Sequence, residues 1–278
     1  MDTTTSNSRH VNLSAYEGVE ALENFTPERF ADYCRDKLLS SDKFVEFIRQ
    51  HCAHDPDWQG KVAEIGSGNS KLLYNLEKQG LLKEGLGIEI SRSRHEFANK
   101  FAEHIGSQRV TNLNEDVFNL PTLTGYDLVI GVDIVLQLIS PLFDKAEDRL
   151  LDWVHSSLRP GGRVLFELWD FEYFKALLAQ SDNALRLWEE FPASDPFEYC
   201  LATLSFDDNK DIVWDKRFIR RSCGQRSEFS NILRPYSPEG ITKILAQAGF
   251  VNPLVIDCSK EGPDGAQGEF LVLAQKAL

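Results

Sequence analysis

Short apolar runs alternate with longer amphipathic segments through most of the 278-residue chain. The short runs have the length of buried strands, and the amphipathic segments repeat their apolar positions at helical spacing. The expected strands are the start of residues 61–69 and residues 85–91, 110–113, 126–132 and 163–168; the expected helices are residues 71–79, 93–104 and 144–158, with a loop or short helix at 134–139. Strands that alternate with helices predict an α/β fold with a parallel sheet.

Two amphipathic helices are expected before the first strand. Residues 26–28, Thr-Pro-Glu, form a helix start: Thr caps free N–H groups, Pro fits the first turn and the acid complements the helix dipole. Apolar residues then recur at helical spacing from residue 30 to residue 48. These helices either pack against the edge of the sheet or close over a ligand as a lid, in which case Tyr16 or Phe25 touches the substrate.

The alternation of strands and helices stops after a further helix, expected at residues 171–191. Residues 200–206, 212–221 and 227–233 then alternate like strands between turn-forming residues, which predicts an inserted antiparallel meander. A basic group on the meander is either a solvated face balanced by nearby acids or a surface that binds a carboxylate or phosphate of an anionic substrate. Its members are Lys216, Arg217, Arg220, Arg221, Arg226 and Arg234.

Residues 61–69, KVAEIGSGN, join a strand, a tight loop and the start of a helix. Gly66 and Gly68 lack a Cβ, so the loop can adopt positive φ and a ligand can lie against its backbone. The helix presents free N–H groups and a positive dipole end to negative charge. Glu89 ends the next strand, at the distance where nucleotide-binding α/β units hold ribose hydroxyls. Glu64 is a carboxylate at the end of a buried strand, where it needs a partner such as the ammonium group of an amino acid.

A dinucleotide site would place its third glycine at Lys71, so the loop departs from that pattern. The run from Glu64 to Ser70 resembles the first motif of the class I S-adenosylmethionine-dependent methyltransferases, an acidic residue followed by three alternating glycines. Ser70 stands where the family has its last glycine. The Pro-Gly-Gly turn at residues 160–162 adds to the resemblance, which covers the chain from residue 44 to the C-terminus apart from the meander.

The resemblance implies a seven-stranded, mostly parallel Rossmann-like sheet with an antiparallel last strand, N-terminal helices and the inserted β meander. The chain then divides into an N-terminal arm with lid helices (1–58), an S-adenosylmethionine-binding α/β core (59–192), the meander (193–234) and the C-terminal completion of the core (235–278). A helix capped by Ser237 and a hairpin of residues 251–258 and 269–275 supply the completion, including the sixth and seventh strands.

The cofactor implied by the resemblance is S-adenosyl-L-methionine, which leaves as S-adenosyl-L-homocysteine. Glu64 then binds the ammonium group of its amino-acid tail, Glu89 holds the ribose, and Asp116 contacts the adenine amino group. The implied cofactor-binding residues are Glu64, Gly66, Ser67, Gly68, Glu89, Ile90, Asp116, Val117 and Asp133.

Methyl transfer to an amine or a phenol needs a general base near the acceptor. Many small-molecule O-methyltransferases of the family that this chain resembles use a histidine after the fourth or fifth strand. Here His104 and His155 fall in helices, so the candidates are Asp133, Asp170 and Tyr236. Asp133 follows the fourth strand, at the edge where open α/β sheets bind ligands. Asp170 is favoured because its Trp-Asp-Phe setting can raise the pKa of the carboxyl group; catalysis by proximity alone is the alternative.

Composition narrows the partners and the location. The net charge of −13 weighs against nucleic acid, because binding to it depends on neutralising phosphates. No apolar run reaches the roughly 20 residues of a membrane span, and the polar residues 1–10 lack the apolar core of a signal peptide. The five scattered cysteines and six histidines lack metal-ligand spacing, which favours a reducing, cytoplasmic setting and no metal.

The sequence therefore predicts a methyltransferase that acts on oxygen or nitrogen of a small molecule, anionic if the basic group binds it. A homodimer formed through the meander is one arrangement, and the meander as a cover over the pocket is another. The alternatives are a non-catalytic S-adenosylmethionine-binding scaffold subunit, a protein or tRNA methyltransferase, and an NAD-dependent oxidoreductase. Glu64 and the missing third glycine disfavour the oxidoreductase.

Overall fold

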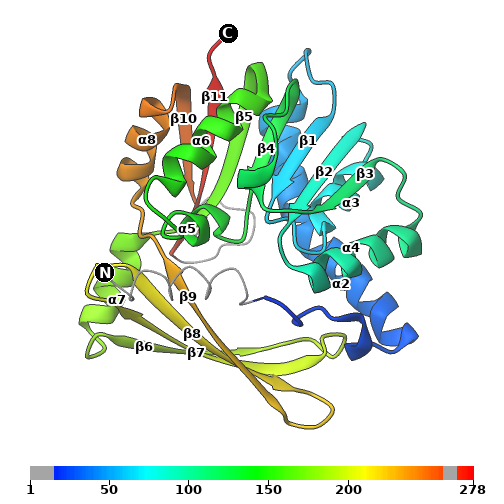
Figure 1. Cartoon of the computed structure of the whole chain (residues 1–278), viewed down its shortest axis with the longest axis vertical. Coiled ribbons are helices and arrows are strands. Elements are labelled where there is room, and N and C mark those ends of the chain that lie inside the picture. The colour runs from blue at the N-terminus through cyan, green and yellow to red at the C-terminus, as the bar shows by residue number, and fades with distance from the viewer. Residues whose placement is uncertain (1–15, 259–267) are drawn as a thin grey trace.

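The computed structural model describes residues 16–258 and 268–278, which form two sheets (Figure 1). The larger sheet has seven strands in the order β10-β11-β5-β4-β1-β2-β3. Its strands are β1 (Lys61–Ile65), β2 (Glu84–Glu89), β3 (Val110–Asn114), β4 (Tyr126–Gly131), β5 (Leu158–Trp169), β10 (Phe250–Asp257) and β11 (Glu269–Lys276). β11 runs antiparallel to both of its neighbours, and the pairs from β5 to β3 are parallel. The predicted α/β fold with an antiparallel last strand is confirmed.

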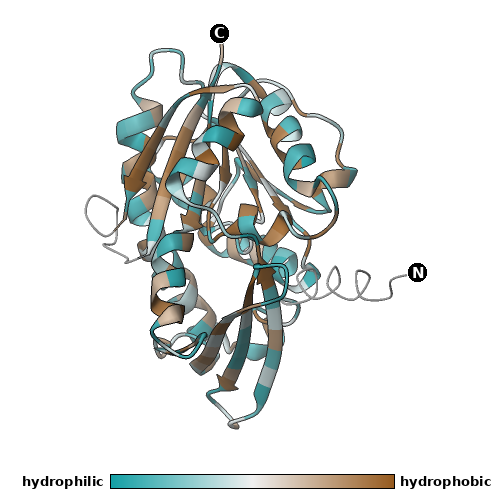
Figure 2. Cartoon of the chain, turned by 90° about the vertical axis from the view of Figure 1, so that its left-hand side faces the viewer, coloured by the Kyte–Doolittle hydropathy of each residue, from teal (hydrophilic) through white to brown (hydrophobic). Residues whose placement is uncertain are grey.

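Helices cover both faces of the larger sheet. Successive residues of a strand point to opposite faces, and in β1 and β4 residues on both faces are apolar and buried. The covering helices are α2 (Pro27–Ile48), α3 (Lys71–Lys78), α4 (Arg92–Ile105), α5 (Val135–Ile139), α6 (Ala146–Ser157) and α8 (Pro238–Gln247), whereas α7 (Phe171–Ala179) packs against the smaller sheet. Val62 and Leu128 are buried in a cluster with α2 and α3, whereas Ala63 and Val129 are buried with α6 and α8. The strands of the larger sheet are accordingly mostly hydrophobic, drawn in brown in Figure 2. No helix of the described residues has the length and apolar character to span a membrane.

The smaller sheet has four antiparallel strands in the order β6-β7-β8-β9 and lies below the larger sheet in Figure 1. They are β6 (Ala184–Glu190), β7 (Phe197–Phe206), β8 (Ile212–Arg220) and β9 (Arg226–Leu233). The last three correspond to the predicted meander. The interpretation of residues 171–191 as one helix is wrong: α7 ends at Ala179, and Asp182 and Asn183 adopt φ of 50° and 59°. These left-handed residues end the helix and lead into β6.

The two predicted N-terminal helices are a single one. Helix α2 has 22 residues and continues directly into a π-helical segment, Arg49–Ala53. Thr26 caps α2 as expected, its Oγ1 accepting the N–H of Arg29 at 3.3 Å. Ser41 lies within this single helix, where its Oγ donates to the carbonyl of Leu38 at 2.7 Å. Residues 1–15 of the predicted N-terminal arm lie outside the described residues.

Asp127 at the start of β4 fixes the chain that leads into β1. Its side chain is buried, with Oδ2 accepting the N–H groups of Gln59 at 3.0 Å and Lys61 at 2.8 Å. Oδ1 accepts Nε of Arg159 at 2.6 Å. Replacing Asp127 by Ala removes all three bonds, so we expect the free energy of unfolding to fall by about 3 to 5 kcal/mol in urea denaturation.

The matched control is Asp32→Ala on α2. Asp32 pairs with Arg35 at 2.8 Å, but its side chain is 52% exposed, so we expect a change below about 1 kcal/mol. A loss for Asp127→Ala no larger than that of the control would contradict the structural role of Asp127.

Candidate active site

Two cavities lie between the sheets. The main cavity, of about 700 Å³, is lined by residues at the C-terminal ends of β1, β2, β4 and β5 and by residues of β6, β7 and β8. The side cavity, of about 200 Å³, shares Tyr16, Arg94 and Asp133 with it. Open α/β sheets bind ligands beyond the C-terminal ends of their strands, so the two cavities form the candidate active site.

The loop after β1 has the backbone that its glycines predicted. Gly66 and Gly68 have φ of +62° and +56°. A Cβ on Gly66 would lie 2.6 Å from Cγ2 of Val135, and a Cβ on Gly68 would collide with the guanidinium group of Arg94. Neither position accepts a side chain without displacing its neighbour, so the loop is a tight cradle next to the cavities.

Ser70, at the position of the family's last glycine, also adopts a left-handed conformation, with φ of 58°. This conformation is strained for a residue with a Cβ. Oγ of Ser70 donates to Oδ1 of Asn112 at 2.7 Å, which helps to hold the strained residue in place.

Glu64 ends β1 with a side chain that is almost fully buried, 3% exposed. Its Oε2 has no hydrogen-bond partner among the described residues. Burial and the nearby Asp133 carboxylate raise the pKa of Glu64 to about 8. A buried carboxyl group with an unpartnered oxygen fits a cationic ligand group that donates hydrogen bonds.

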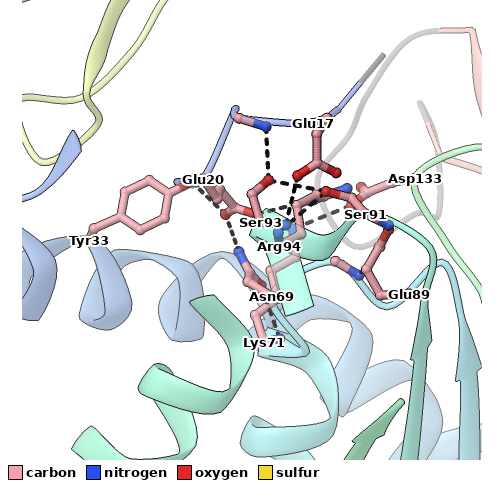
Figure 3. A network of polar contacts seen from close by, with 12 residues as sticks. Glu17, Glu20, Tyr33, Asn69, Lys71, Glu89, Ser91, Ser93, Arg94 and Asp133 are labelled. Atoms are coloured by element: carbon pink, nitrogen blue, oxygen red, sulfur yellow. Dashed lines mark hydrogen bonds and ion pairs between the residues drawn. The ribbon is translucent and has the colours of Figure 1, made fainter. Parts of the chain in front are cut away.

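Glu89 ends β2, and its side chain binds backbone N–H groups of the loop after β1 and of the segment after β2 (Figure 3). Its Oε2 accepts the N–H of Gly68 at 2.8 Å, and its Oε1 accepts the N–H of Ser91 at 2.7 Å. Each carboxylate oxygen has a further lone pair. Glu89 also lines the main cavity, so these lone pairs suit hydroxyl donors of a ligand.

The loops after β2 and β3 add apolar surface to the main cavity through Ile90 and Val117. Asp116 lines the same cavity, and its side chain accepts the N–H of Phe118 at 2.9 Å. All nine predicted cofactor-binding residues except Gly68, which lies beneath Arg94, line one of the two cavities.

Solved structures with the same architecture decide the fold. The chain matches an S-adenosylmethionine-dependent methyltransferase from Clostridium acetobutylicum with a TM-score of 0.62 and 17% identity, over 85% of this chain and 99% of that one. The chain has the class I methyltransferase fold. The sheet order agrees, with the seventh strand, β11, inserted antiparallel between β5 and β10.

Two further matches have more specific names. One is the amino pentose methyltransferase CalS10 from Micromonospora echinaspora, with a TM-score of 0.60 and 14% identity over 91% of this chain and 98% of that one. The other is the sugar N-methyltransferase KedS8 from a Streptoalloteichus species, with a TM-score of 0.62 and 12% identity over 86% and 88%. At these identities the likeness concerns the fold. No family model and no curated protein matches the chain.

Asp133 lies in the loop after β4 of this methyltransferase fold, as predicted, and it is strained. Asp133 and Ile134 have φ of 55° and 57°, a conformation that costs a non-glycine residue about 1 to 3 kcal/mol. The Asp133 side chain is exposed and lies 3.6 Å from Nζ of Lys71. The charge of Lys71 holds the pKa of Asp133 below its ordinary value, so the carboxylate is charged at neutral pH.

Glu167 of β5 is a site residue that the sequence analysis missed. It is 7% exposed, lines the main cavity beside Trp169, and its Oε2 accepts the N–H of Asp133 at 2.7 Å. Burial, with the charge of Asp133, raises the pKa of Glu167 to about 8. The available signal was the one that identified Glu64: an acid near the end of a buried parallel strand needs a partner.

A network between the N-terminal arm, defined here as residues 16–25, and α4 was also missed (Figure 3). Glu20 accepts hydrogen bonds from Tyr33 at 2.8 Å, Asn69 at 2.6 Å and Arg94 at 2.9 Å. Glu17 accepts the first N–H groups of α4. Arg94 lies in the first turn of α4, where the helix dipole disfavours a positive charge. An arginine at this unfavourable position was the feature of the sequence that could have indicated an acidic partner.

Two of the predicted catalytic residues line neither cavity. Asp170 caps α7, accepting an N–H two residues on at 3.0 Å. The hydroxyl of Tyr236 is hydrogen-bonded to Oγ of Ser140 at 2.6 Å and to the Glu147 carboxylate. Burial and the charge of Glu147 raise the pKa of Tyr236 far above its ordinary value, which disfavours it as a base.

The N-terminal arm borders the two cavities. Tyr16 lines both cavities, whereas Phe25 packs against Phe97 of α4, their ring centroids 5.2 Å apart. Of the two aromatic residues predicted to touch the substrate, only Tyr16 therefore lies at the site.

Three arginines of the basic group of the smaller sheet are engaged within the protein. Arg217 lies 3.5 Å from Glu228, and Arg234 lies 3.0 Å from Asp211. Arg221 donates to backbone carbonyls in the segment between β6 and β7. These contacts favour the balanced face over an anion-binding surface.

Glu64→Gln is expected to stabilise the fold at high pH. The pKa of Glu64 rises from 4.5 to about 8 on folding, so the folded chain binds more protons between these values and stability falls as pH rises through them. Gln does not titrate. We expect the free energy of unfolding of Glu64→Gln to exceed that of the wild type by roughly 2 to 5 kcal/mol at pH 9, with little difference near pH 4.

Urea denaturation across this pH range measures the difference. Glu84→Gln, in which the replaced side chain is 58% exposed at the start of β2, is the control and should show no such trend. A difference between Glu64→Gln and the wild type that does not change with pH would contradict the raised pKa.

Proposed function

We infer that the chain is an S-adenosylmethionine-dependent methyltransferase that acts on a nitrogen of a small-molecule amine. The observation that carries the cofactor assignment is Glu64: a buried carboxyl group with an unpartnered oxygen, next to a glycine cradle in a methyltransferase fold. NAD has no ammonium group to meet this carboxylate, so Glu64 supports the amino-acid tail of S-adenosylmethionine.

The cofactor roles follow the geometry of the cavities. Glu64 accepts hydrogen bonds from the ammonium group, and Glu89, already fixed by two backbone N–H groups, accepts them from the ribose hydroxyls. Ile90 and Val117 pack against the adenine ring, with Asp116 at its amino group. Gly66 allows the ligand to approach the backbone, because its Cα carries no side chain.

The rest of the main cavity favours a cationic acceptor. Its lining combines the indole rings of Trp169 and Trp188 with the carboxylates of Glu167, Glu189 and Glu269, and it also includes Lys43 and Arg94. Aromatic faces and carboxylates attract an ammonium group and repel an anion. Together with the engaged arginines of the smaller sheet, this lining supports an amine rather than an anionic acceptor. The names of CalS10 and KedS8, an amino pentose and a sugar N-methyltransferase, agree with this choice.

The acceptor nitrogen needs its lone pair, so an ammonium group must lose a proton before it attacks. Bound S-adenosylmethionine supplies the electrophilic methyl group. Glu167 has a raised pKa and lines the main cavity, and we assign it the role of proton acceptor. Asp133 carries a negative charge, since the nearby Lys71 lowers its pKa, and attracts the amine. This attraction holds the acceptor nitrogen close to the methyl group.

Calorimetric titration of the purified chain tests the cofactor. We expect S-adenosylmethionine and S-adenosylhomocysteine to bind and NAD not to bind. Replacing both Glu64 and Glu89 by Ala should weaken binding by at least about 10-fold, because each loses charge-assisted hydrogen bonds. Binding of NAD alone would overturn the assignment. Binding of S-adenosylmethionine without turnover of any amine or hydroxyl acceptor, with a protein that co-purifies, would favour a scaffold subunit.

Glu167→Gln tests the proton acceptor with an amine found in such an acceptor panel. We expect kcat/KM to fall by about 100- to 10,000-fold while cofactor affinity is unchanged. In the wild type, kcat/KM should rise with pH until Glu167 is ionised, and the variant should lack that rise.

The control is Glu172→Gln on α7, whose side chain is 62% exposed and lines neither cavity. It should keep the rate and the pH profile of the wild type. If Glu167→Gln behaved in the same way, Glu167 would not be the proton acceptor.

A further inference from the structure

Lys216 of β8 is a buried amine enclosed by aromatic rings. The residue is 2% exposed, and its Nζ lies 3.4 Å from the ring centroid of Trp214, 4.7 Å from that of Tyr16 and 4.8 Å from that of Phe229. Nζ donates to the hydroxyl of Tyr16 at 3.1 Å. It forms no ion pair with any carboxylate of residues 16–258 and 268–278. Aromatic faces return only part of the solvation that a buried cation loses, so this site lacks an anion.

The side cavity places that cation near the group assigned to the cofactor's ammonium. Lys216, Glu64 and Ser67 line this space of about 200 Å³, and Oε2 of Glu64 and Oγ of Ser67 have no partner among the described residues. Arg94 lines it too, with its guanidinium 5.2 Å from the Tyr16 centroid, so two cations contact one ring. A small cavity with an unpartnered acid and an unpaired cation matches the opposite charges of an amino acid.

We propose that Lys216 binds the carboxylate of the cofactor's amino-acid tail, while Glu64 binds the ammonium group. The proposal rests on the function inferred above and deepens it. The inserted sheet then contributes to the cofactor site in addition to covering the acceptor, and Tyr16 of the N-terminal arm joins the two layers through its contacts with Lys216 and Arg94.

The proposal makes cofactor binding depend on the protonation of Lys216. Burial lowers the pKa of Lys216 to about 7, and the charge of Arg94 adds to this, whereas Cys200 and Glu189 oppose it; the hydroxyl of Tyr16 faces it as well. A bound carboxylate raises that pKa, so binding takes up a proton and the contribution of Lys216 is lost as pH rises above 7.

Glu64 has the opposite linkage, because an ammonium group favours its charged form. The ratio of dissociation constants between a Lys216 variant and the wild type isolates Lys216, since Glu64 and the other groups are common to both.

The probe is S-adenosylhomocysteine, which has the amino-acid tail without the sulfonium charge. At pH 6 we expect Lys216→Met to bind it about 10- to 100-fold more weakly than the wild type. At pH 9.5 the two dissociation constants should converge, because the wild-type lysine is then neutral. The Lys216→Arg side chain stays charged between pH 6 and pH 9.5. The affinity of this variant for S-adenosylhomocysteine should therefore lack the fall with rising pH that Lys216 causes in the wild type. 5′-Methylthioadenosine, which lacks the tail, should bind the wild type and Lys216→Met equally.

Lys210→Met, in the exposed turn between β7 and β8, is the matched control, and thermal unfolding of each variant verifies the fold. Equal affinity of Lys216→Met and the wild type at pH 6 would overturn the proposal, as would a loss that is the same at both pH values or that extends to 5′-methylthioadenosine. If the wild type bound no S-adenosylhomocysteine at any pH, the proposed function itself would fail instead.

Discussion

Four carboxylates meet at the C-terminal edge of the larger sheet: Glu64, Glu89, Asp133 and Glu167. Parallel strands direct their C-terminal ends to one edge, so acids at several strand ends become neighbours. Their mutual repulsion and their burial raise the pKa values of Glu64 and Glu167, whereas the charge of Lys71 lowers the pKa of Asp133. Such an arrangement is unfavourable without a ligand and becomes favourable when positive charge enters. The functional proposals depend on this constraint.

The second layer covers part of this edge. The smaller sheet covers the edge with the rings of Trp188 and Trp214, and the N-terminal arm closes one side with Tyr16. Glu64 and Glu167 are buried, so a ligand's charge interacts more strongly with these carboxylates than it would in water. The arm is anchored at both layers: Glu20 binds Arg94 of α4, and Tyr16 contacts Lys216 of β8.

The pattern of apolar residues predicted the strands and helices correctly where a segment between two breaks contains one element only. It failed where two elements follow each other without a glycine or proline between them. The segment after Phe171 looked like one helix because Asp182 and Asn183, unlike glycine, are not strong breakers, yet both adopt left-handed backbone. The opposite error divided α2 into two helices, although the chain stays helical from Pro27 to Ile48 and Oγ of Ser41 bonds back to the carbonyl of Leu38.

Glu64, Gly66, Gly68 and Glu89 could be found from the sequence, because a strand, a glycine turn and a following acid lie within about thirty residues, as in other nucleotide-binding units. The sequence by itself thus determined the α/β order and the edge of the sheet that carries the candidate cofactor site. Only the tertiary structure decided the acceptor side: it placed Asp170 and Tyr236 outside the cavities, brought Glu167 into one, and enclosed Lys216 with a tyrosine 200 positions away. Contacts between residues so distant in the chain leave no periodic signal, since they arise from the packing of one layer on another.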